Sequence, residues 1–146
     1  MPAMTAHDLK ALHRALAEAV FLGDDPRAIE PLVAPSHVLH QSVSKGLPPG
    51  RGGVVWGVEK LRSSFAKAYL QIEDQIAARD RCFTRLTAQL RHTGRLAAAR
   101  PTGRFVTLQA MVLSRFEAGK IQETWLETSD FDLLRELAAV ELAQEG

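Results

Sequence analysis

Three ionisable side chains of this sequence have the types needed to move a proton. His40 lies in a segment predicted to be extended, residues 37–44, and an imidazole that titrates near neutral pH suits proton transfer or polarisation of a carbonyl group. Glu127 lies in the last predicted strand, and Asp130 follows that strand. A bulge would turn Glu127 inward, where burial would raise the pKa of its carboxyl group. The alternatives are a hydrogen-bonded structural histidine and two exposed carboxylates, one of them favoured by a helix N-terminus.

Two larger side chains are candidates for binding a substrate. Arg85 alternates with Leu86 along a predicted strand whose apolar residues share the other face, and this favours the outer surface of a sheet for Arg85. Facing inward instead, its guanidinium group would bind a carboxylate or enolate oxygen. Trp56 follows a loop rich in glycine and proline, residues 45–53. It is either a stacking wall for a substrate or a core residue.

Composition excludes several classes of protein. The net charge of +1 gives no surplus for binding a nucleic-acid backbone. Cys82 is the single cysteine, so no internal disulfide and no cysteine-based zinc site is predicted, and a reducing, cytoplasmic location is expected. No secretory leader and no membrane span are expected, because charged residues interrupt the apolar residues that follow Met1 and no apolar run reaches the length of a span. The residues 50–53 do not match a phosphate-binding loop, which ends in Gly-Lys-Ser/Thr.

Helical patterns are concentrated in the first half of the sequence. Thr5 and Asp8 form a predicted capping box for a helix that runs to about Gly23. Asp25-Pro26 starts a brief second helix that stops near Pro35. Apolar residues at helical spacing predict a third helix from Val54 to about Leu70, and Ser129 with Asp132 predicts a closing helix.

Alternating patterns fill the second half of the sequence. Residues 72–76, 82–90, 106–114 and 121–128 have period-two hydrophobicity, and residues 117–120 form a tight turn. Helices followed by a meander of strands predict an α+β fold in which the helices cover one face of a curved, mainly antiparallel sheet. One domain is expected over residues 1–146, with a core of about 5–140 and frayed termini. A pocket is expected between the helices and the sheet.

Several short motifs, taken together with their order and spacing, resemble the SnoaL-like polyketide cyclases (ester cyclases) of the nuclear-transport-factor-2-like superfamily. The resemblance extends from the first helix to Leu137. The motifs are Leu32-Val33-Ala34-Pro35 through His40, Pro48-Pro49-Gly50-Arg51, His92-Thr93-Gly94, Pro101-Thr102-Gly103-Arg104, and Phe116-Glu117-Ala118-Gly119-Lys120-Ile121 followed by Trp125.

The resemblance implies a cone-shaped α+β barrel, a homodimer formed through the outer sheet face, and a buried pocket for a small hydrophobic molecule. It also implies no metal and no nucleotide cofactor. Family members that close a ring by aldol chemistry use an aspartate on the last strand, and Leu126 occupies that position here. Their helper positions correspond to Ala110 and Val112, and a pocket tyrosine corresponds to about Val20.

These four aliphatic residues are therefore expected to shape the pocket, with Thr124 the hydroxyl nearest to the missing aspartate. An apolar pocket without proton-transfer groups still accelerates a reaction that depends on conformation. We therefore expect a cofactor-independent cyclase or isomerase of natural-product metabolism, with a pericyclic closure as one route and a hydrophobic polyketide-like substrate polarised by His40 and Thr124. The alternatives are an acid/base aldol cyclase or epoxide hydrolase that uses His40 with Glu127 or Asp130, and a non-catalytic binding or dimerisation module.

Overall fold

The computed structural model describes residues 4–23, 25–41, 47–95 and 100–129. The described residues form two α-helices, a short 3₁₀ helix and a sheet of five strands. One α-helix and the 3₁₀ helix come before the first strand, and the other α-helix lies between the first and second strands. In chain order the elements are α1 (Ala6–Phe21), η1 (Pro26–Ile29), β1 (Val33–Gln41), α2 (Arg51–Ser64), β2 (Phe65–Ala78), β3 (Arg81–His92), β4 (Phe105–Glu117) and β5 (Lys120–Thr128).

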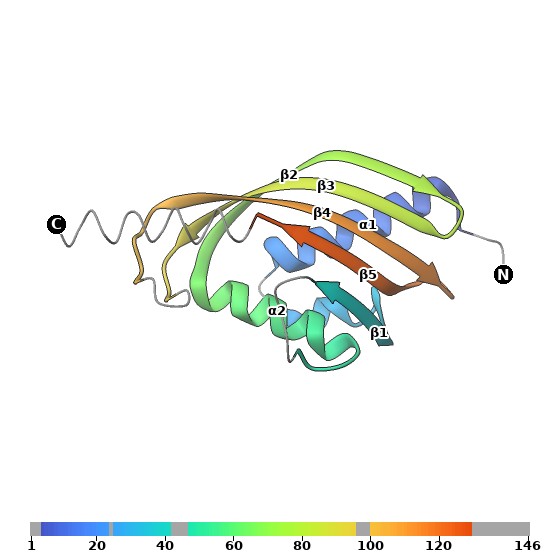
Figure 1. Cartoon of the computed structure of the whole chain (residues 1–146), viewed down its shortest axis with the longest axis horizontal. Helices are drawn as coiled ribbons and strands as arrows, with labels where there is room; N and C mark the ends of the chain where they lie inside the picture. Colours follow the sequence, from blue (N-terminus) through green and yellow to red (C-terminus); the bar gives the residue numbers. More distant parts are fainter. Residues whose placement is uncertain (1–3, 24, 42–46, 96–99, 130–146) are drawn as a thin grey trace.

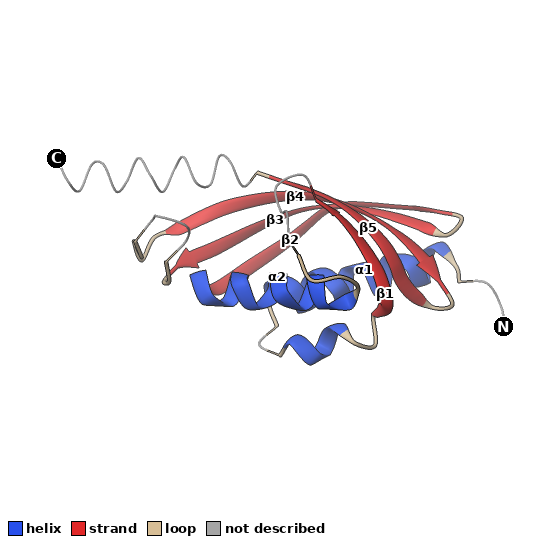
Figure 2. Ribbon diagram, turned by 60° about the horizontal axis from the view of Figure 1, so that its bottom comes forward, coloured by secondary structure: helices blue, strands red, loops and turns tan. Residues whose placement is uncertain are grey.

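The sheet is curved, and the helices lie on its concave face (Figures 1 and 2). Its strand order is β1-β5-β4-β3-β2. Neighbouring strands from β2 to β5 are antiparallel, whereas β1 pairs in parallel with β5, so the first and last described strands lie side by side. This arrangement confirms the predicted cone-shaped α+β fold with a mainly antiparallel sheet.

Helix α1 begins at the predicted capping box. The Asp8 backbone N–H donates to the Thr5 hydroxyl, and the Thr5 backbone N–H donates to the Asp8 carboxylate. One face of the helix is buried against the sheet and carries Leu9, Leu16 and Phe21. The apolar spacing of the sequence therefore fixes both the start and the buried face of this helix.

Two predicted boundaries in the first half of the chain are wrong. The helix predicted to reach Leu70 ends at Ser64, because Phe65 starts strand β2 and pairs with His92. The second predicted helix is only the 3₁₀ turn η1, and β1 already begins at Val33. In both places, pairing with a distant strand overrides a local helical pattern. The closing helix predicted after Ser129 lies outside the described residues.

Two glycines of α2 differ in what a side chain would meet. A Cβ added at Gly57 meets no atom within 4 Å, whereas one added at Gly53 would lie 2.8 Å from the Pro48 carbonyl oxygen. We expect Gly57→Ala to raise the free energy of unfolding by about 0.5–1 kcal/mol, because alanine favours the helix, and Gly53→Ala to lower it. Urea unfolding of both variants measures the difference, and equal effects would contradict the packing described here.

The outer face of the sheet carries exposed hydrophobic side chains as well as charged ones. Exposed hydrophobic side chains lie along it on three strands, β1, β2 and β4: Val38, Tyr69, Ile76, Phe105 and Met111. Within the described residues no helix covers this face (Figure 2). The molecule therefore has a concave face buried by its helices and a convex face with exposed hydrophobic side chains.

Candidate functional site

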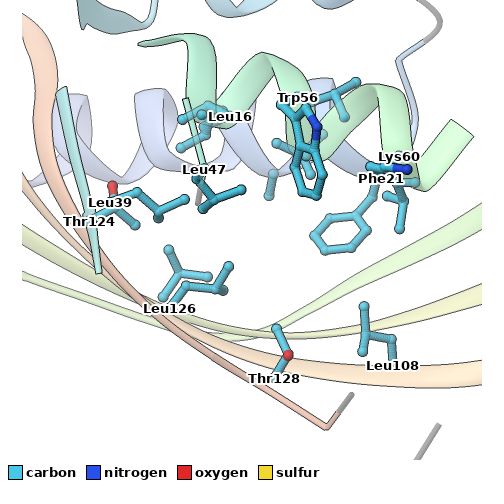
Figure 3. Close-up of a pocket in the computed structure, with 18 of the residues that line it drawn as sticks. Leu16, Phe21, Leu39, Leu47, Trp56, Lys60, Leu108, Thr124, Leu126 and Thr128 are labelled. Carbon is cyan, nitrogen blue, oxygen red and sulfur yellow. The ribbon is translucent and has the colours of Figure 1, made fainter. Parts of the chain in front are cut away.

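A cavity of about 460 Å³ lies between α2, the C-terminal half of α1 and the concave face of the sheet (Figure 3). Most of its wall is aliphatic or aromatic. The apolar side chains that line it include Leu16, Val20, Phe21, Leu39, Leu47, Trp56, Leu61, Leu86, Leu108, Val112 and Leu126. A cavity of this volume and lining suits a hydrophobic small molecule.

A buried row of hydroxyl and imidazole groups crosses one end of the cavity wall. Nδ1 of His13 lies 2.6 Å from the Thr84 hydroxyl, and Nε2 of His13 lies 3.0 Å from the Ser114 hydroxyl. The Ser114 and Thr124 hydroxyls are 2.9 Å apart. Nε2 of His37 lies 2.9 Å from the Thr124 hydroxyl. We call these five residues the buried polar chain, and four of its members, all except Ser114, line the cavity.

Both histidines of the buried polar chain are neutral at physiological pH. Burial lowers the pKa of His13 to about 4, and it lowers the pKa of His37 to about 4 as well, because the charged imidazolium loses its hydration. Each ring therefore carries one N–H and one bare nitrogen. The buried polar chain therefore offers hydrogen-bonding groups at the cavity but no permanent charge.

The charged groups at the cavity are cationic. Lys60 and Arg95 contribute to its lining, and the Lys60 ammonium group lies 5.5 Å from the centre of the Trp56 ring. Among the residues that the structure describes, no carboxylate lines the cavity. A carboxylate base of the kind used in aldol closure is therefore absent from the described wall.

Five of the residues predicted from the sequence to form the site do line the cavity: Val20, Trp56, Val112, Thr124 and Leu126. Their side chains come from α1, α2, β4 and β5, and Leu126 and Thr124 point toward the cavity in Figure 3. Ala110 is 2% exposed and packs in the adjoining core rather than in the lining.

Three other predicted site residues lie on the convex face of the sheet. Nε2 of His40 is 2.7 Å from the Glu123 carboxylate, and its ring stacks on Trp125 with a centroid distance of 5.0 Å. Arg85 forms an ion pair of 2.7 Å with Asp74. Glu127 is exposed on the same face. The sheet thus separates them from the cavity, and Asp130 lies outside the described residues.

His13 and His37 are the functional candidates that sequence reasoning missed. His13 lies on the apolar stripe of α1, four residues after Leu9, which is a signal for a buried histidine. His37 differs from His40 by an odd number of residues in the same strand, so the two rings point to opposite faces of the sheet. Only the curvature of the sheet, which the sequence does not report, identifies His37 and not His40 as the histidine at the cavity.

Neither a metal site nor a membrane span is evident in the described part of the chain. No group of three potential metal-binding side chains is found there. None of the described helices is long and apolar enough to cross a membrane.

Comparison with known proteins identifies the family. The model of the SnoaL-like polyketide cyclase family matches residues 10–137, and the chain belongs to this family. No curated protein sequence matches the chain.

Solved structures share the fold over almost the whole chain. TsrD from Streptomyces laurentii is 20% identical, with a TM-score of 0.81, and the match covers 93% of this chain and 98% of TsrD. IdmH from Streptomyces antibioticus, a candidate polyketide cyclase, is 25% identical with a TM-score of 0.74, over 88% of this chain and 97% of IdmH. AclR from Streptomyces galilaeus, a candidate hydroxylase, is 25% identical with a TM-score of 0.77, over 92% and 98%.

Proposed function

We propose that this protein is a cofactor-independent cyclase or isomerase that folds a hydrophobic, polyketide-like molecule inside its cavity and so promotes ring closure. The observation that carries the proposal is the cavity of about 460 Å³ with an apolar wall and a neutral polar end. Holding a flexible molecule in a reactive conformer contributes up to about 7–11 kcal/mol in well-oriented intramolecular reactions. A pericyclic closure needs no carboxylate base, and no carboxylate lines the cavity among the described residues.

The comparisons support the class of ligand. The chain belongs to the polyketide cyclase family, and IdmH, at 25% identity, is a candidate polyketide cyclase. Within this proposal, Val20, Val112 and Leu126 shape the substrate, and Trp56 provides a flat wall beside it. The proposal places the reaction in a reducing cytoplasm, which suits the buried free thiol of Cys82.

An acid/base mechanism by His40 with Glu127 has weaker support. Both side chains lie on the convex face, on the other side of the sheet from the cavity wall. A non-catalytic binding module is the second candidate function, because the same cavity would hold a ligand without transforming it.

We also propose that a second copy of the chain covers the convex face. Five exposed hydrophobic side chains lie on that face, and burying them in a symmetric homodimer removes them from water. The family resemblance points to the same interface. A solution mass of twice the chain mass of 16.0 kDa in analytical ultracentrifugation is expected.

Binding and ring closure are tested in sequence on the purified protein. N-phenyl-1-naphthylamine, a neutral fluorescent probe, is expected to bind with enhanced emission. Open-chain trienones of different tether length, including 1,7,9-decatrien-3-one, are then incubated with the protein. Their closure converts two carbon–carbon π bonds into two carbon–carbon σ bonds, moves the remaining double bond and loses no atoms. Because the trienone is achiral, the uncatalysed bicyclic ketone is racemic.

The two candidate functions give different results. A cyclase is expected to accelerate closure and give one enantiomer in excess, which chiral chromatography measures. Probe binding with racemic product at the background rate supports the binding module instead. Absence of any probe binding would remove the cavity as a functional site and contradict both.

A further inference from the structure

We propose that Nδ1–H of His37 is the hydrogen-bond donor that binds a carbonyl oxygen of the substrate, and that the buried polar chain holds His37 in this tautomer. This inference rests on the proposed function and deepens it, because it names the substrate class: a hydrophobic molecule with a ketone, ester or amide carbonyl at the end of the cavity near Thr124. His37 is then a substrate-binding residue, and the other members of the chain are positioning residues.

Gln75 sets the direction of the hydrogen bonds at the end of the buried polar chain that lies away from His37. Its side-chain nitrogen lies 3.0 Å from the Lys10 carbonyl oxygen, which only accepts hydrogen bonds, so the amide group there is the donor. The same nitrogen lies 3.1 Å from the Thr84 hydroxyl and therefore donates to it as well. Thr84, which is 1% exposed, must then place its own proton on another acceptor.

That acceptor is Nδ1 of His13, at 2.6 Å. The sulfur of Cys82 on the same strand face is a much weaker acceptor than an imidazole nitrogen. His13 is neutral, so with Nδ1 accepting, its proton is on Nε2 and is donated to the Ser114 hydroxyl at 3.0 Å. Each later group accepts from one neighbour and donates to the next.

The series of donated hydrogen bonds ends at His37. Ser114 donates to Thr124 over 2.9 Å, and Thr124 donates to Nε2 of His37 over 2.9 Å. Since His37 is also neutral, its single proton is on Nδ1. Nδ1 has no hydrogen-bond partner in the structure and is itself buried, in a residue that is 2% exposed and contributes to the cavity wall. A ligand oxygen therefore reaches Nδ1 after a small turn of the imidazole ring toward the cavity.

An unpartnered N–H in an apolar wall favours one kind of ligand atom. Leaving a buried donor unsatisfied is unfavourable, and a ligand oxygen that accepts from it recovers this free energy. A neutral donor suits a neutral acceptor such as a carbonyl oxygen. The hydrogen bond also withdraws electron density from the carbonyl carbon, which activates a conjugated alkene in a ring closure.

The tautomer is tested by ¹⁵N NMR of the histidine-labelled full chain at neutral pH, with resonances assigned through single substitutions. We expect His37 to show a pyrrole-like Nδ1 and a pyridine-like Nε2, and His13 to show the reverse. The conservative variant Thr124→Val, which removes the link but keeps the side-chain volume, is expected to move His37 toward a mixture of tautomers. A purely structural role for Thr124 predicts no such change. A proton on Nε2 of His37 in the unaltered protein would overturn the inference.

Ligand preference is tested with two matched probes, 2-acetylnaphthalene and 2-ethylnaphthalene, which differ chiefly in the carbonyl oxygen. Affinities are measured by displacement of N-phenyl-1-naphthylamine from the unaltered protein and from His37→Phe. We expect the ratio of ketone to hydrocarbon affinity to fall by about tenfold in the variant. We also expect the carbonyl stretch of the bound ketone to return to higher frequency.

The outcomes separate the two proposals. If both probes bind the unaltered protein and the ratio is the same in His37→Phe, this inference fails while the cavity remains a binding site. If neither probe binds, the proposed function fails. Thermal unfolding of His37→Phe shows whether the variant is folded, and the tautomer measurement on the unaltered protein does not depend on it.

Discussion

Replacing Leu126 with tryptophan is expected to weaken binding of N-phenyl-1-naphthylamine by at least about tenfold while the protein stays folded. Leu126 is partly buried and projects into the cavity, so a larger side chain there fills space that the ligand needs (Figure 3). Because the cavity holds only about 460 Å³, an indole ring occupies a substantial part of it. The same variant is expected to lose any acceleration of trienone closure.

Two matched variants show whether the loss comes from the cavity. Leu126→Met keeps the side-chain volume and is expected to bind the probe nearly as well as the unaltered protein. Glu59→Trp adds the same indole ring to an exposed position of α2 that does not line the cavity, and it is expected to bind the probe as the unaltered protein does. Equal binding by Leu126→Trp and the unaltered protein would place the probe somewhere other than this cavity.

Stability is expected to fall steeply as the pH drops from about 6.5 to about 4. Burial lowers the pKa values of His13 and His37 from 6.5 to about 4, so in this interval the unfolded chain binds protons that the folded chain does not. The contribution of these two neutral histidines to the free energy of unfolding is therefore fully present above pH 6.5, the pKa in the unfolded chain. It is lost as the pH falls toward about 4, the pKa in the folded protein. His13 alone contributes about 3 kcal/mol of this loss. His92, whose pKa is also lowered by burial, acts in the same direction.

Urea unfolding at neutral pH and near pH 4.5 measures this dependence. The variant His13→Asn is expected to be less stable at neutral pH, because Thr84 and Ser114 lose a partner, but to lose less stability on acidification. His7→Asn, at an exposed position of α1, is the control and is expected to follow the unaltered protein. A pH dependence that is the same in all three proteins would contradict the assignment of the effect to the buried ring.

The sequence predicts those parts of the fold that depend on near neighbours. The capping box of Thr5 and Asp8 and the alternation in β3 to β5 involve residues a few positions apart, and the structure contains them as expected. The end of α2 could not be predicted in this way. Residues 65–70 continue a helical spacing, and only pairing with β3 makes them a strand.

The same limit applies to the site. Val112 and Leu126 were placed through the resemblance, whose turn before β5 fixes the register of the paired strands. His37 and His40 are chemically identical, and their roles differ only because one face of the sheet is concave. No local pattern reports that curvature, so the sequence alone indicates His40 for an acid/base role and does not single out His37, the histidine that contributes to the cavity wall. The position of Thr124 in the sequence indicates its hydroxyl as a site residue, but the other four members of the buried polar chain come from four other elements, α1, β1, β3 and β4.

The pairing of the first strand with the last one has a consequence for synthesis of the protein. Strand β1 leaves the ribosome early, but its partner β5 is completed only when Thr128 has been translated. His37 and Thr124, whose hydrogen bond joins the two strands, are separated by 87 positions. Contacts at such separation form late, because a long loop must close first. We therefore expect nascent chains to display the apolar side of α1 without a cavity, and the binding site to be the last part of the domain that matures.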